Sequence, residues 1–125
     1  MNDNATARLN IEDTANGRPA SRSNYGNAPG GTVSLDIRLL SGILKLAQTY
    51  AFSVSELAGG SHSPNSRHYA GVTLDVNVIN GQHVGNAHPN FRNFMRDCRA
   101  LGATQVLGPG DPGHATHIHC AWPRP

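Results

Sequence analysis

The chain has 125 residues, a formal net charge of +2 with neutral histidines, and two cysteines. This length suits one compact domain and is too short for two. The arginines that carry the positive charge form no run and share no face, so the composition does not favour a nucleic-acid-binding protein. No segment has the length of a transmembrane helix, and the chain does not open with the charged and apolar regions of a signal peptide. We therefore expect neither a nucleic-acid nor a membrane partner.

Residues 1–31 differ in composition from the rest of the chain. They are rich in Asn, Gly, Ser, Pro and Ala, and their apolar residues are few and isolated. Such a segment buries too little apolar surface to offset the entropy lost on ordering. The sequence therefore predicts a flexible polar arm or linker over residues 1–31, whose removal the protein should tolerate, and a folded domain over residues 32–125. Whether the arm belongs to a small exported protein or joins the domain to a longer chain stays open.

The first half of the predicted domain begins with a helix over residues 34–50. Its apolar residues recur every three to four positions and form one wide stripe: Leu35, Leu39, Leu40, Ile43, Leu44, Leu46 and Ala47. Residues 52–57 alternate apolar and polar side chains, which predicts a half-buried strand. A loop containing Gly, Ser, Pro and Asn leads to a second strand over residues 72–79. Asn80-Gly81 is a dipeptide that favours a two-residue hairpin turn, so we expect a return strand after it.

The second half of the domain begins with another helix, which starts near Pro89 and ends at Gly102. Its apolar side chains share one face: Phe91, Phe94, Met95, Cys98 and Leu101. Residues 104–107 and 116–122 read as two short strands on either side of a Gly/Pro loop. The order of elements predicts an α+β fold, in which a small antiparallel sheet packs on two helices.

The two cysteines do not define a redox compartment. Cys98 falls on the apolar face of the second predicted helix, where a buried free thiol is the commoner state. Cys120 lies in the last predicted strand, and the two side chains could either pair or stay apart. Their spacing lacks the paired pattern of a structural zinc site.

The seven histidines are the unusual feature of so short a chain, and five of them form two clusters. In the first cluster, His68 precedes a predicted strand that contains Asp75, and Gly71 between them allows a close backbone approach. Nitrogen and oxygen donors that converge in this way suit zinc. In the second cluster, His117 and His119 lie on one face of the last strand, about 7 Å apart. One of these imidazoles can bind a metal while the other stands beside it. Three protein ligands with one open position are typical of a catalytic zinc site.

These residues carry a resemblance to a known family. The motif SxHxxGxxxD over residues 66–75, followed by HxH at residues 117–119, resembles the zinc D-Ala-D-Ala carboxypeptidase and hedgehog-type peptidase superfamily. The likeness extends over residues 35–122, because the order of helix, strand, loop and motif also agrees. The resemblance implies a hedgehog/DD-peptidase-like fold in which His68, Asp75 and His119 bind Zn²⁺.

The resemblance also implies a catalytic role for His117, as general base or as an electrostatic partner of the tetrahedral intermediate. Many relatives place an acidic general base three residues before the last metal histidine, where this chain has Thr116. An alternative register uses His114 as the ligand and Asp111 as the base, but a Gly/Pro loop holds ligands less rigidly than a strand. Relatives that remove a terminal D-Ala often carry an arginine in the stretch where this chain offers Glu56. This difference favours an endopeptidase over a carboxypeptidase.

The function implied by the resemblance is that of a zinc metallopeptidase. We expect a hydrolase that cleaves an amide bond in peptidoglycan stem or cross-bridge peptides, in the manner of an endolysin or another cell-wall-degrading enzyme. It should act as a monomer at the cell wall, although the sequence shows no export signal. Two alternatives stay open: an N-acetylmuramoyl-L-alanine amidase, and a zinc-containing module that binds the cell wall or a protein without catalysis.

Overall fold

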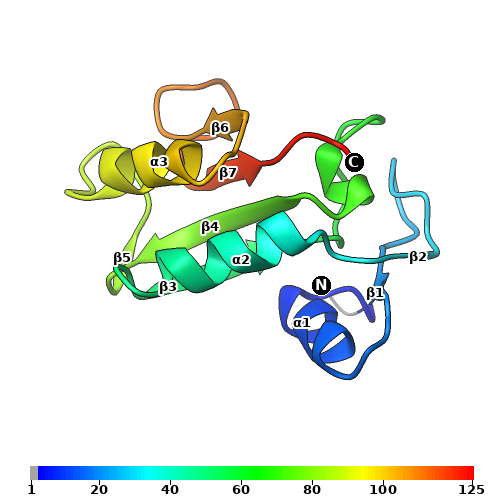
Figure 1. Ribbon diagram of the computed structural model, residues 1–125. Coiled ribbons are helices and arrows are strands. Elements are labelled where there is room, and N and C mark those ends of the chain that lie inside the picture. The colour runs from blue at the N-terminus through cyan, green and yellow to red at the C-terminus, as the bar shows by residue number, and fades with distance from the viewer. Residues whose placement is uncertain (1–2) are drawn as a thin grey trace.

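The computed structural model describes residues 3–125 and confirms an α+β fold (Figure 1). The helices are α1 (Ala7–Ala15), α2 (Ile37–Leu46) and α3 (Phe91–Ala100), together with a 3₁₀ turn over Arg67–Ala70. The strands are β1 (Ala20–Ser21), β2 (Thr32–Val33), β3 (Phe52–Glu56), β4 (Thr73–Ile79), β5 (Gln82–His83), β6 (Gln105–Leu107) and β7 (Ile118–Ala121). In this described part of the chain, no helix is long and apolar enough to cross a membrane.

The main sheet is antiparallel, with strand order β3-β4-β7-β6 and the short β5 paired with β4. β1 and β2 form a separate antiparallel pair. The predicted hairpin is confirmed: Asn80 and Gly81 have φ values of 52° and 80° and connect β4 to β5. Asparagine and glycine tolerate these positive φ angles better than other residues, which explains why this dipeptide makes the turn.

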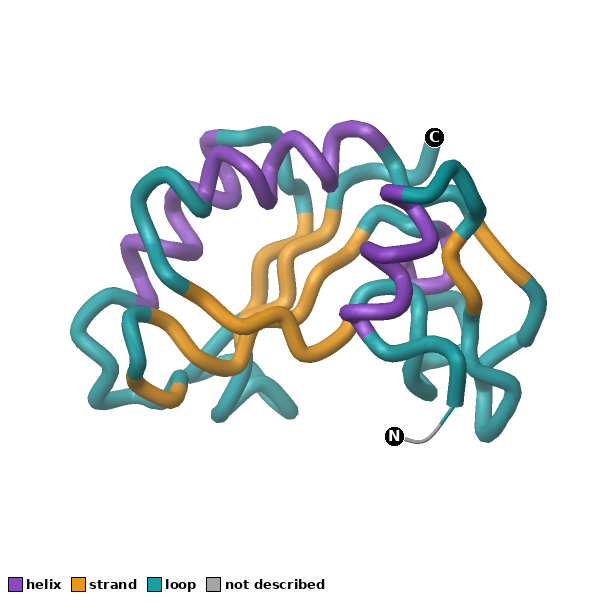
Figure 2. The backbone as a smooth tube through the Cα atoms, turned by 90° about the horizontal axis from the view of Figure 1, so that it is seen from below, coloured by secondary structure: helices purple, strands orange, loops and turns teal. Residues whose placement is uncertain are grey.

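The core lies between the sheet and the two helices α2 and α3, which cover the same face of the sheet (Figure 2). Leu74 of β4 is paired across the sheet with Cys120 of β7, and Cys120 contacts α3, so both side chains face the helices. Trp122 closes the core. Its indole N–H donates to the Leu101 carbonyl, and a methyl group added at Gly42 of α2 would meet its ring at 2.7 Å.

A disulfide bond joins Cys98 of α3 to Cys120 of β7. Sequence reasoning favoured a buried free thiol at Cys98. The pairing depends on the position of β7 in the sheet, which brings the two Cα atoms to 6.4 Å, within the range that a disulfide spans. The bond therefore fixes the last strand to the helix that covers it.

Residues 3–31 are folded, which differs from the flexible arm predicted for residues 1–31; residues 1 and 2 lie outside the described part. Thr6 caps α1 by accepting a hydrogen bond from the amide of Leu9. The Asn10 side chain on α1 is fully buried and accepts the amide hydrogen of Ala58. Hydrogen bonds of this kind, together with the buried Ala7 and Ala20, hold the segment against the rest of the domain. Composition alone does not reveal them.

The remaining elements agree with the predictions in type and differ in length. α2 is shorter than the predicted 34–50 because Asp36, whose carboxylate accepts the Arg38 amide hydrogen, caps it later than expected. β7 is shorter than the predicted 116–122, so His117 lies just before the strand rather than within it. This position gives His117 a backbone setting different from that of His119.

Candidate metal centre

The centre is built on a row of side chains that crosses the sheet. The strand register places Asp75 of β4 opposite Glu56 of β3 on one side and opposite His119 of β7 on the other. Cross-strand partners share a face, and Leu74 next to Asp75 faces the helices. The row therefore lies on the face of the sheet that α2 and α3 do not cover. The Asp75 side chain is nonetheless buried, with 6 % of the residue exposed.

His68 is brought over this row by the 3₁₀ turn that precedes β4. Ser66 caps the turn by accepting the His68 amide hydrogen, and Gly71 ends it at a φ of 74°. A side chain at Gly71 would meet the backbone carbonyl of Ser34 at 2.7 Å, so glycine is needed for this approach. The chain then enters β4 directly, and His68 Nε2 lies 3.2 Å from Asp75 Oδ2.

The hydrogen bonds of both imidazoles direct unprotonated nitrogens toward Asp75. His68 Nδ1 lies 2.6 Å from the Leu57 carbonyl and must donate to it, which leaves a lone pair on Nε2. His119 Nε2 lies 2.8 Å from the amide oxygen of Gln105 and donates to it. Its Nδ1 therefore presents a lone pair 3.3 Å from Asp75 Oδ1. A metal-binding histidine has the same second contact, because a backbone or side-chain acceptor fixes its tautomer.

This arrangement fits a metal ion. His68 Nε2 and Asp75 Oδ1 are buried and have no hydrogen-bond partner. Acceptor atoms that face one another away from water repel, and the repulsion is removed when a metal cation lies between them or when an imidazole takes up a proton. Two imidazole nitrogens and a carboxylate are a common donor set for first-row divalent metals.

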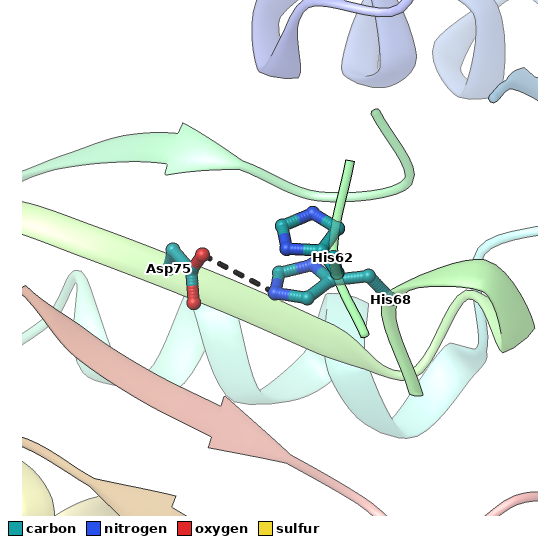
Figure 3. Close-up of side chains that lie close together, drawn as sticks. All are labelled: His62, His68 and Asp75. Atoms are coloured by element: carbon teal, nitrogen blue, oxygen red, sulfur yellow. Dashed lines mark ion pairs between the residues drawn. The ribbon is translucent and has the colours of Figure 1, made fainter. Parts of the chain in front are cut away.

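His62 stands beside this centre. The ligand atoms of His62, His68 and Asp75 lie within 4.8 Å of one another, so these three form a group that could hold a metal ion (Figure 3). The His62 ring stacks on the His68 ring, with centroids 3.8 Å apart and planes 7° apart. Imidazole binds metals in its ring plane, so an ion in the plane of His68 lies outside that of His62. His62 Nε2 also faces Glu56 at 2.8 Å. The group within 4.8 Å does not include His119, whose Nδ1 lies 3.3 Å from Asp75 Oδ1. The ring stacking and the Glu56 contact are the reasons for proposing His119 rather than His62 as the third ligand.

The charges in the centre differ from those of free side chains. Burial acts to raise the pKa of Asp75, but the imidazoles of His119 and His68, when protonated, bond to the carboxylate and together outweigh burial, so its pKa is lowered and it stays ionised. Burial acts to lower the pKa of His62, but its hydrogen bonds with Glu56 and the Gly59 carbonyl and the nearby negative charges together outweigh burial and raise the pKa.

His117 is shifted in the opposite direction from His62. Burial lowers its pKa, and the neighbouring His114 and His119 lower it further, although Asp75 acts in the other direction. His117 is therefore neutral at pH 7 and has an imidazole nitrogen able to accept a proton.

The centre opens into a cavity of about 480 Å³. Its wall contains the three predicted ligands, the predicted catalytic residue and two arginines: His68, Asp75, His119, His117, Arg67 and Arg124. His114 also lines it, with its ring 4.8 Å from that of His117. Asp111, the base of the alternative register, instead accepts the Gly108 amide hydrogen within its own turn. The structure therefore gathers the residues of the favoured register around one cavity.

Two residues of the site were not assigned this position from the sequence. The sequence places His62 only in the loop that leads to the second predicted strand, and its stacking on His68 depends on the fold of residues 57–62. Gln105 was read only as part of a strand. The strand register explains the contact of Gln105 with His119. β6 lies next to β7, and Gln105 is two residues before Leu107, the residue that pairs with His119.

Comparison with known proteins gives no relative: no protein-family model matches the chain, and searches of curated proteins and of solved structures give no significant match.

Proposed function

We propose that the protein is a zinc-dependent hydrolase that cleaves an amide bond in peptidoglycan peptides, with a hedgehog/DD-peptidase-like fold. One observation carries this proposal: nitrogens of His68 and His119 lie 3.2 and 3.3 Å from the buried Asp75 carboxylate at the wall of a cavity, and His68 Nε2 and Asp75 Oδ1 have no hydrogen-bond partner. His68, Asp75 and His119 would hold the ion. These are the three residues of the motif shared with the zinc peptidases.

Each part of the centre has a task in amide hydrolysis. Zinc, when bound, supplies a Lewis acid that lowers the pKa of water to about 7 and polarises a carbonyl. His117 lines the cavity and has a lowered pKa, so it can accept the proton of the attacking water and return it to the leaving amine. His117 lies beside the proposed ligands and can take the role of general base, for which many relatives have an acidic residue where this chain has Thr116.

The cavity wall also suits a peptide that carries carboxylates. Arg67 and Arg124 line it, whereas Asp75 is its one acidic residue among those described. The Arg67 guanidinium is fixed by donating to Thr104 Oγ1 at 2.7 Å. Fixed guanidinium groups bind carboxylates well, and peptidoglycan stem peptides contain free carboxylates.

The test uses purified sacculi and the intact chain. The zinc-loaded protein should release soluble fragments, a strong chelator should stop the release, and added Zn²⁺ should restore it. Mass analysis of the fragments should show cleavage between amino acids of the stem or cross-bridge. Fragments cut between muramic acid and the peptide would assign the amidase activity instead. A chain that binds sacculi and zinc but releases nothing would show a binding module.

A further inference from the structure

The loop over residues 57–62 is the main support of His68 outside its own turn. The Leu57 carbonyl accepts the His68 Nδ1 hydrogen at 2.6 Å, and the His62 ring packs on the His68 ring at 3.8 Å. One end of the loop thus fixes the tautomer of His68, and the other end fixes the plane of its ring. A shift of this loop would turn the nitrogen that faces Asp75.

The N-terminal segment holds the beginning of this loop. Asn10 of α1 accepts the Ala58 amide hydrogen at 2.9 Å, and its own amide group donates to the Ser21 carbonyl at 3.0 Å. Asn10 is fully buried, and its bond with Ala58 is shielded from water. The segment also packs tightly here, because a side chain at Gly59 would meet the Ala5 carbonyl at 1.8 Å.

Two more contacts hold the rest of the loop. Ser23 Oγ accepts the Gly60 amide hydrogen at 2.9 Å, and Ser23 is also buried. The side-chain amide of Asn27 donates to the His62 carbonyl at 3.0 Å. Together with the bond from Asn10, these contacts reach every second residue of the loop. Hydrogen bonds are directional, so three of them fix the path of the loop more closely than apolar packing would.

We propose that residues 3–31 are a positioning element of the metal centre, with Asn10 and Ser23 as its principal residues. They act through the backbone of the loop on the orientation of His68, and the segment is part of the working site rather than a linker. This inference rests on the proposed metal centre. It reverses the sequence-based expectation that the segment is dispensable.

The test measures metal affinity directly, with Co²⁺ titrated into the metal-free chain and followed by its visible absorption, and with Zn²⁺ in competition. Asn10→Ala should weaken Co²⁺ binding by about tenfold or more, the range seen when an outer-shell support of a ligand is removed. Val84→Ala is the matched control. Val84 is a buried core residue that follows β5 and donates its amide hydrogen to Asn77 of β4, so its truncation should lower stability without touching the loop. Ser23→Ala should also weaken binding, and Ser23→Thr, which keeps the hydroxyl, should recover most of the loss.

The outcomes separate the two proposals. Wild-type protein that binds neither ion contradicts the metal centre, and the positioning role falls with it. The positioning role alone is overturned if wild type and Asn10→Ala bind the metal with equal affinity. It is also overturned if Val84→Ala has the same melting temperature as Asn10→Ala and loses as much metal affinity. A loss confined to Asn10→Ala and Ser23→Ala, with a changed Co²⁺ spectrum, supports it.

Discussion

Replacing Asp75 by asparagine distinguishes a metal site from a cluster of side chains that simply bond to one another. In the metal-free protein, the carboxylate faces two imidazole lone pairs at 3.2 and 3.3 Å. An asparagine side chain can donate to His68 Nε2 and accept from His119 Nδ1 if the Gln105 amide reverses. The substitution removes one metal ligand, yet it pairs groups that were unpaired.

The size of the effect follows from the unpaired atoms. A buried polar group without a partner costs about 1–3 kcal/mol, and His68 Nε2 and Asp75 Oδ1 are two such groups. If the pairing recovers about 1–2 kcal/mol, the melting temperature of the metal-free variant should rise by about 4–8 °C for a chain of this size. Wild-type protein should instead gain stability on adding Zn²⁺, by about 2.7 kcal/mol at a hundredfold excess over the dissociation constant.

Differential scanning calorimetry at pH 8, above the ordinary pKa of imidazole, measures both effects on chelator-treated samples. We expect Asp75→Asn to be the more stable protein without metal and to show no shift when zinc is added. A metal-free Asp75→Asn protein that is several kcal/mol less stable than wild type would refute the reasoning. It would mean that Asp75 serves as a structural partner of protonated histidines.

Three further predictions follow from the site and the core. His119→Ala should abolish metal binding, whereas His117→Ala should keep the metal and lose most of the turnover. The control His83→Ala, at an exposed position on β5, should change neither property. Metal analysis and hydrolysis of sacculi check all three variants. Cys98→Ala should lower the free energy of unfolding by about 3 kcal/mol, because the disulfide spans 22 residues. Reduction of the wild-type disulfide should cause the same loss, and urea titration measures both. Burial and the hydrogen bond with the Asp97 carboxylate raise the pKa of Tyr50 to about 12. The contribution of the Tyr50 hydroxyl to folding stability is therefore present below pH 10 and is lost as the pH rises toward 12. Tyr50→Phe should flatten the stability profile over that range, and an unchanged profile would contradict this assignment.

Local sequence patterns were enough to predict the elements that depend on neighbouring residues. The apolar period of α3, the alternation in β3 and the turn at Asn80 and Gly81 each arise within a few positions. The pair His68 and Asp75 was found for the same reason, since a single turn joins them.

Features that depend on distant parts of the chain were missed. The disulfide needs the position of β7 under α3, and the stacking of His62 needs the path of its loop. The fold of the N-terminal segment depends on Asn10, a polar residue that satisfies backbone groups 48 positions away. Composition counted it as evidence for disorder, because hydrogen bonding across such distances leaves no periodic trace.

The place of β7 in the sheet also sets an order of assembly. His68 and Asp75 lie seven residues apart and can approach each other early, but His119 joins them only when the final strand enters between β4 and β6. A chain synthesised only as far as β4 therefore has two of the three proposed ligands and lacks the geometry to hold an ion firmly. The pairing between Asp75 and His119 needs the chain to be made beyond residue 119, so the candidate metal centre forms after the hairpin of β4 and β5 can form.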